Sequence, residues 1–198
     1  MKNLSLASIV LLAACASSSS TSEPRSPDHR ASAGATEAAR SDGEVVAVLA
    51  TIDHGEIEQG RLAQSNATDA DARAFGARMV AMHTESTARM SALARQQGIT
   101  PDETDESRRL AAAATSVLQT LQGMHGADFD RAYIDAQVTQ HTEALQKIDQ
   151  VLLPRAQNPA LRVAIRDDVR PMVAAHLDRA REIQSRMRSS SGMDAGAM

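Results

Sequence analysis

Three segments of the chain share one pattern, in which a histidine interrupts a row of apolar residues. They read MVAMHTESTARM at Met79–Met90, QVTQHTEALQKI at Gln137–Ile148 and MVAAHLDRAREI at Met172–Ile183. Each has a valine three residues before the histidine, an acidic residue two after it and an apolar residue seven after it. Apolar residues that recur at this spacing line one face of an α-helix. The pattern therefore places one histidine on the inner face of each of three packed helices.

The rest of the sequence predicts an all-α chain. Aromatic residues make up only 2% of it, so Ala, Leu, Val, Ile and Met must fill the core, and strong helix formers are frequent. Residues 98–127 form one long connection that carries a shorter helix over about 106–121, whereas the other turns are short. This arrangement favours a ferritin-like four-helix bundle over a simple up-down bundle. The long amphipathic helices are expected over about 41–64, 69–97, 128–156 and 159–188.

One polar residue interrupts the apolar row of each long helix. Burying an unpaired polar group costs roughly 1–3 kcal/mol, so four of them in one core need partners. Asp130 and Tyr133 lie two to three turns before the third histidine on nearly the same side of its helix, and we expect them to support the cluster. The four residues are Glu56, His83, His141 and His176.

Three interpretations of this polar core remain open. The residues could hold a single transition-metal ion such as zinc, iron or copper, because imidazole and carboxylate suit these metals. They could instead form a hydrogen-bonded network that fixes the register of the helices, or serve separate roles. The di-iron pattern of ferritin-like bundles is absent, because the residue three before each histidine is Val and not Glu. His29, His54 and His125 are expected in solvent.

No motif of a known reaction is present. The sequence has no glycine-rich phosphate loop, nucleophile elbow or His-Glu-x-x-His zinc motif. No basic patch with interleaved aromatics appears, and the net charge is −4, so nucleic acid is not an expected partner. We therefore expect a non-catalytic binding or interaction module, with an envelope protein or a second copy as partner. The alternative is a metal-binding or redox bundle with a Glu/His₃ site.

The N-terminus resembles a bacterial lipoprotein signal. Lys2 precedes the short apolar run Leu4–Leu12, which is shorter than the ~20 residues of a membrane-spanning helix. Leu12–Cys15 resembles a lipobox, which implies cleavage before Cys15 and lipid on its sulfur; the alternative is an ordinary secretion signal with an incidental cysteine. Ala16, rather than Asp, follows and favours the outer membrane, with the protein facing the periplasm.

The expected organisation of the chain follows from these observations. The segment after Cys15 is rich in Ser, Ala and Pro without apolar periodicity, as is typical of a flexible tether. The C-terminal tail has a similar composition and is expected to be disordered. The divisions are a signal peptide over 1–14, the lipidated cysteine and tether over 15–40, the bundle over 41–188 and the tail over 189–198.

The residues from about 42 to 187 resemble the bacterial domain-of-unknown-function family 4142. The resemblance rests on Glu56 with the following Leu-Ala, on Phe75–Thr84, on Phe129–Tyr133 leading to the next histidine, and on Val169–Leu177. It implies a ferritin-like bundle and an envelope location, since members are often labelled outer membrane proteins. It implies no activity. Family members usually have Asp directly before the histidine of the second long helix, and this chain has Met82 at that position.

Overall fold

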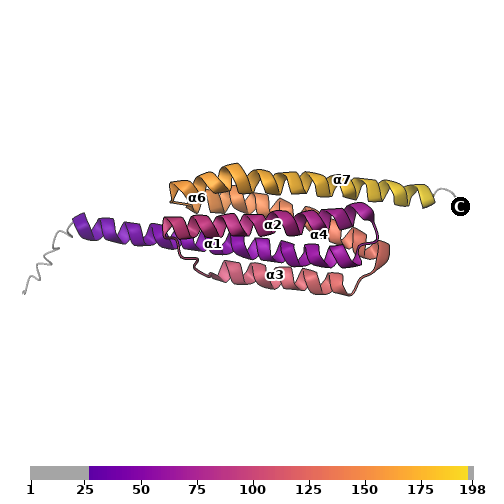
Figure 1. Ribbon diagram of the computed structural model, residues 1–198, viewed down its shortest axis with the longest axis horizontal. Helices are drawn as coiled ribbons and strands as arrows, with labels where there is room; N and C mark the ends of the chain where they lie inside the picture. The colour runs from indigo at the N-terminus through magenta and orange to yellow at the C-terminus, as the bar shows by residue number, and fades with distance from the viewer. Residues whose placement is uncertain (1–26, 196–198) are drawn as a thin grey trace, which may run out of the picture.

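The computed structural model describes residues 27–195, which form helices joined by short links and contain no strand (Figure 1). The fold is an all-α bundle, as the sequence predicts. Four long rods make up the bundle, and a fifth helix, α3, packs on its side. The helices are α1 Pro27–Asn66, α2 Ala70–Gln97, α3 Asp105–Gln122, α4 Gly126–Lys147, α5 Leu153–Arg155, α6 Pro159–Ala164 and α7 Arg170–Ala195.

The lengths of the connections determine which helices are antiparallel neighbours and which run parallel. Helices α1 and α2 form one antiparallel hairpin, and α4 and α7 form the other. Helix α3 runs beside α1 along the bundle and returns the chain to the end where α2 began, so that α4 runs parallel to α2 (Figure 1). This is the bundle with one long crossover that the connection over 98–127 predicts.

Both ends of the helical region differ from the expected bounds. α1 begins at Pro27 instead of about residue 41, and α7 continues to Ala195 instead of ending near residue 188. The expected tether and tail therefore overlap helices that project beyond opposite ends of the bundle (Figure 1). Residues 28–40 lack apolar periodicity but are rich in Ala, the strongest helix former, and this propensity favours helix there. The expected signal peptide and Cys15 lie outside the described residues.

The two hairpins are closed by matching turns. Asp130 of α4 accepts hydrogen bonds from the backbone N–H groups of Thr68 (2.9 Å) and Asp69 (2.8 Å) in the α1–α2 turn. In the same way, Asp42 of α1 accepts from the backbone of Gln157 (2.7 Å) and Asn158 (3.0 Å) in the turn before α6. Each hairpin thus uses a buried carboxylate to hold the turn of the other, which supports an internal repeat.

Two π-helical turns, η1 Ile148–Leu152 and η2 Ile165–Val169, interrupt the second hairpin. Proline lacks an N–H and crowds the carbonyl four residues earlier. For Pro154 and Pro171 that carbonyl lies inside η1 and η2 respectively. The wider π turns accommodate both prolines within nearly continuous rods. The interruption before Pro171 therefore takes the form of a π turn.

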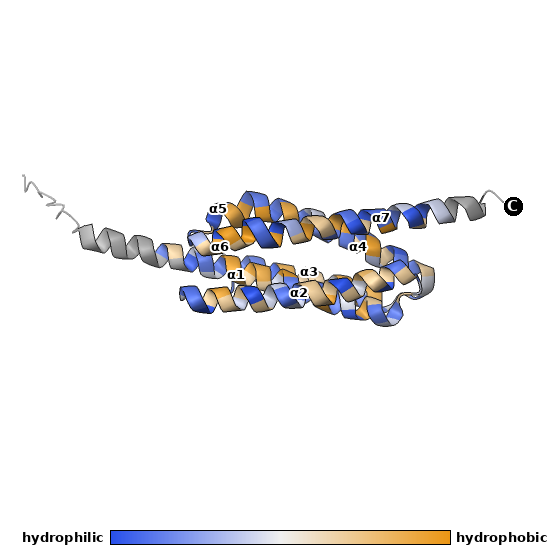
Figure 2. Ribbon diagram, turned by 45° about the horizontal axis from the view of Figure 1, so that its top comes forward, coloured by the Kyte–Doolittle hydropathy of each residue, from blue (hydrophilic) through white to orange (hydrophobic). Residues whose placement is uncertain are grey.

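Hydrophobic residues gather on the sides of the rods that face one another (Figure 2). The core forms two clusters along the bundle axis. Small residues let α1 and α2 approach closely near the turn that joins them: a Cβ on Gly76 would lie 2.7 Å from the Cβ of Ala63 and 2.8 Å from the carbonyl oxygen of Gly60. The polar core residues lie between the two clusters.

Candidate metal centre

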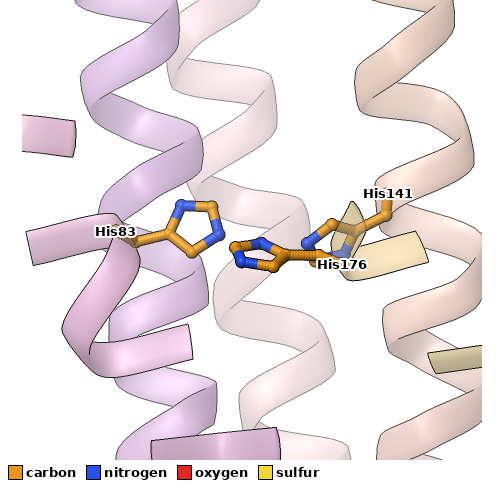
Figure 3. A group of neighbouring side chains, drawn as sticks. All are labelled: His83, His141 and His176. Atoms are coloured by element: carbon orange, nitrogen blue, oxygen red, sulfur yellow. The ribbon is translucent and has the colours of Figure 1, made fainter. Parts of the chain in front are cut away.

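Three histidines from three helices meet in the interior. His83 of α2, His141 of α4 and His176 of α7 are at most 2% exposed. Figure 3 shows their rings pointing toward one another, with His176 between the other two. The ring centroids of His176 lie 5.2 Å from those of His83 and 5.4 Å from those of His141. One ring nitrogen from each lies within 4.8 Å of the others.

Asp53 of α1 determines the proton position on His83. Its Oδ1 lies 2.8 Å from His83 Nδ1, and both residues are buried. A carboxylate accepts hydrogen bonds, so Nδ1 carries the proton and donates it. The lone pair of His83 is therefore on Nε2, which has no hydrogen-bonding partner among the described residues. A carboxylate behind a histidine in this way is the usual support of a metal-binding imidazole.

His141 has the same proton arrangement through a backbone group. Its Nδ1 lies 3.0 Å from the carbonyl oxygen of Gln137, one turn earlier, and donates to it. Its Nε2 is buried and has no partner within residues 27–195, and the same holds for Nδ1 of His176. Each histidine thus presents one unpaired nitrogen in a region that water does not reach.

The environment keeps the rings of His141 and His176 neutral. Burial, together with the nearby His83 and His141, lowers the pKa of His176 to about 3. Burial also lowers the pKa of His141, although the neighbouring Glu56 carboxylate opposes this effect. A metal binds the neutral imidazole, so no proton has to be displaced at neutral pH.

Glu56 lies beside the three histidines, as its place on the apolar row of α1 predicts. It is 4% exposed, and its Oε1 lies 3.9 Å from Nδ1 of His141. Its Oε2 has no hydrogen-bonding partner in the described part of the chain. Nδ1 is on a different side of the ring from the free Nε2. The possible ligand atoms that lie within 4.8 Å of one another therefore come from three histidines, and Glu56 is adjacent to His141.

The two expected supporting residues have different places. Tyr133 is fully buried, and its ring lies 6.2 Å from that of Phe75, which in turn meets the rings of His141 and His176 edge-on. Burial and the charge of Glu56 raise the pKa of Tyr133. Asp130 does not join the cluster, because both its oxygens bond the α1–α2 turn. The spacing of residues along one helix predicts the face on which a side chain such as Asp130 lies. It does not predict which other element that face packs against.

The remaining histidines follow the expectation where they are described. His54 and His125 are exposed, whereas His29 lies in a part of α1 whose side chains the structure does not describe. Three buried polar residues near the centre were not predicted. Asp53 lies three residues before Glu56, one turn away on the same face, and this spacing was the available signal. The other two, Gln59 and Gln137, join each other through a 3.2 Å hydrogen bond.

The geometry fits a transition-metal ion with small movements. Histidine nitrogens bind zinc at ~2.0–2.1 Å, so two ligands of one ion stand at most ~4.2 Å apart. One ring nitrogen from each of the three histidines lies within 4.8 Å of the others, close to this limit. Three neutral imidazoles suit zinc, copper, iron or nickel, and leave at least one coordination position for another ligand.

A comparison with protein-family models matches residues 27–183 to a model described as "Domain of unknown function (DUF4142)". No curated protein and no solved structure was found to match the chain. Among the described helices, none combines the length and apolar character that crossing a membrane requires.

Proposed function

Since the chain belongs to the DUF4142 family, whose description assigns no activity, we propose its function from its own geometry: the bundle binds one transition-metal ion through His83, His141 and His176. The convergence of three buried imidazoles, each with one unpaired ring nitrogen, carries this proposal. Of the two functions that the sequence leaves open, this convergence supports metal binding over a module without a cofactor.

The energetics of the buried nitrogens support the same conclusion. Each buried polar atom without a partner costs roughly 1–3 kcal/mol, and each of the three neighbouring histidines carries one such atom. A hydrogen-bonded network among the rings would satisfy them, but no hydrogen bond joins one described histidine to another. A bound metal ion satisfies all three nitrogens at once, and Asp53 orients His83 for it.

Elemental analysis tests the proposal directly. Protein purified without a polyhistidine tag and then loaded with zinc, copper or iron should retain about one equivalent of metal per chain after desalting. His141→Ala should lose that equivalent, whereas His54→Ala, a change at an exposed histidine, should keep it. Substoichiometric metal in the unmodified protein for every metal would refute the proposal.

We also propose that the protein is anchored to the bacterial outer membrane by lipid on Cys15 and faces the periplasm. The short apolar run and the lipobox-like Leu12–Cys15 support this location. Cys15→Ala should move the protein from the membrane fraction to the soluble fraction of fractionated cells. Membrane association that persists in this variant would contradict lipid anchoring.

A further inference from the structure

A groove of about 760 Å³ lies between α3 and α4, with α1 as its floor. Its walls are mostly apolar. Many of the side chains that line it are small, and this leaves space between the helices. α3 contributes Leu110, Ala113 and Val117, and α4 contributes Ala136 and Ala144. The volume is in the range of sites that hold small organic molecules.

Glu56 is the buried polar residue in the floor of this groove. It is 4% exposed, and its Oε2 has no hydrogen-bonding partner in the part of the chain that the structure describes. A buried carboxylate without a partner is costly. A metal ion on Nε2 of His141 would not repay this cost, because Glu56 lies at Nδ1, on a different side of that ring. The carboxylate therefore requires a donor from another source.

The charges around the groove favour a cation as that source. Three acidic residues line it: Glu56, Asp135 and Glu143. Its one lining cation, Lys147, already pairs with Glu106 of α3. Asp135 lies 3.9 Å from Arg188, but neither Glu56 nor Glu143 pairs with a Lys or Arg among the described side chains. The groove thus combines apolar walls with uncompensated negative charge.

We propose that this groove binds an amphipathic organic cation, a molecule with an apolar body and one protonated amine. The amine donates to the carboxylate of Glu56, and the body packs on the alanines of α3 and α4. An anion is repelled by the acidic residues. A neutral molecule of the same shape gains the apolar contacts but leaves Glu56 unpaired. The site borders the three-histidine centre at Glu56, and its binding does not depend on a metal.

Three naphthalene probes of one shape and different charge test this site: 1-naphthylmethylamine, 1-naphthylmethanol and 1-naphthylacetate. The chain contains no Trp, so naphthalene fluorescence reports binding to the purified full chain without interference. The titrations are done with EDTA present, which makes the outcome independent of metal binding. The amine should bind at least ~10-fold more tightly than the alcohol, as expected for a hydrogen bond to a charged group, and the acetate should not saturate.

Two variants locate the binding. Glu56→Gln should reduce the affinity for the amine to that for the alcohol, whereas Glu85→Gln, at an exposed acid on α2, should leave it unchanged. Ala136→Phe fills the groove and should weaken both probes. Circular dichroism checks the fold of each variant, and Glu143→Gln takes the place of Glu56→Gln if the latter does not fold. Equal affinities for amine and alcohol, no saturable binding, or an amine affinity that neither acidic variant changes would each overturn the proposal.

Discussion

The hydrogen bond between Asp53 and His83 is the contact that most directly prepares a nitrogen for metal. Asp53 Oδ1 accepts the proton of Nδ1 at 2.8 Å, and its Oδ2 lies 3.2 Å from the hydroxyl of Thr87. Both contacts hold the carboxylate at one orientation, and the carboxylate in turn fixes the ring. Asp53, a residue of α1, thus keeps the proton on Nδ1 of His83 and leaves the lone pair of Nε2 free.

Replacing this carboxylate by its amide should weaken metal binding without removing a ligand. In Asp53→Asn the group that faces His83 is neutral and can also present its NH₂, so the preference for a proton on Nδ1 is weakened. We expect ~10–100-fold lower affinity for zinc, the usual effect of losing such support. Competition with a fluorescent zinc chelator measures it. Glu58→Gln, at a surface acid paired with Arg61, is the control and should bind as the unmodified protein does.

The depressed pKa of His176 makes the metal-free protein sensitive to acid. In the unfolded chain this histidine takes up a proton near pH 6.5, whereas in the folded protein its pKa is about 3. The unfolded state binds more protons between these values, so the free energy of unfolding falls as the pH falls below about 6.5. At about pH 5 this single residue accounts for a loss of about 2 kcal/mol.

Urea unfolding of the metal-free protein at about pH 7.5 and about pH 5 measures this loss. Other groups also titrate in this range, so the comparison is between variants. His176→Gln should lose about 2 kcal/mol less than the unmodified protein on acidification, and His54→Gln, changed at an exposed histidine, should lose the same amount as the unmodified protein. The same loss in His176→Gln would show that this residue does not cause the acid sensitivity.

For individual residues, the sequence predicts which face of a helix each one occupies. It does not predict which residue of a neighbouring helix each one contacts. The inward positions of Glu56 and the three histidines follow from the helical period of their apolar neighbours. The partner of His83 does not, because Asp53 belongs to α1 and meets it only through the packing of α1 against α2. Asp130 shows the converse: its side of α4 was predicted, but its partner is a turn and not the metal centre.

The turns, rather than the long rods, hold the elements in register. Asp130 makes three hydrogen bonds to the α1–α2 turn, two to backbone N–H groups and one of 2.5 Å to the hydroxyl of Thr68. Arg73 also bonds the carbonyl oxygen of Ala67 at the end of α1. The turn before α6 repeats both features, with Asp42 as the carboxylate and Arg162 bonding the carbonyl oxygen of Ala156.

Removing the Asp130 carboxylate should therefore destabilise the fold and leave the metal stoichiometry unchanged. Asp130→Ala leaves the buried donors of the turn without an acceptor, which costs ~2–4 kcal/mol. Urea unfolding measures the loss, and zinc titration of the folded variant should still give one equivalent. Asp42→Ala should behave alike, and Asp128→Ala, at an exposed acid of α4, should change little. Loss of zinc binding in folded Asp130→Ala would instead place this residue in the centre.

The sequence predicts the bundle better than it predicts where its rods end. Apolar periodicity marks only the packed part of a helix, so it misses the parts of α1 and α7 that project beyond the bundle. The prolines likewise predict that the helix is interrupted, but they do not predict whether the interruption is a kink or a π turn. A π turn inserts one residue and keeps the rod nearly straight, and whether this or a kink occurs depends on the helix packed opposite.

In the molecule as a whole, the proposed metal centre lies where the two hairpins meet. His83 belongs to the α1–α2 hairpin, and His141 and His176 belong to the α4–α7 hairpin. The hydrogen bonds from Asp130 and Asp42 connect the two hairpins at opposite ends of the bundle. An ion bound near the middle adds a contact where the interior is polar. An ion that binds the folded protein more tightly than the unfolded chain raises stability.

Zinc at about 100 times its dissociation constant should stabilise the fold by ~2.7 kcal/mol and raise the melting temperature by ~5–10 °C for a domain of this size. Differential scanning calorimetry with and without zinc measures the shift. His83→Asn removes the one ligand of the α1–α2 hairpin and should abolish most of it, because two ligands on the other hairpin cannot join the halves. His125→Asn, at an exposed histidine, should show the full shift. A full shift in His83→Asn would place zinc outside the junction of the hairpins.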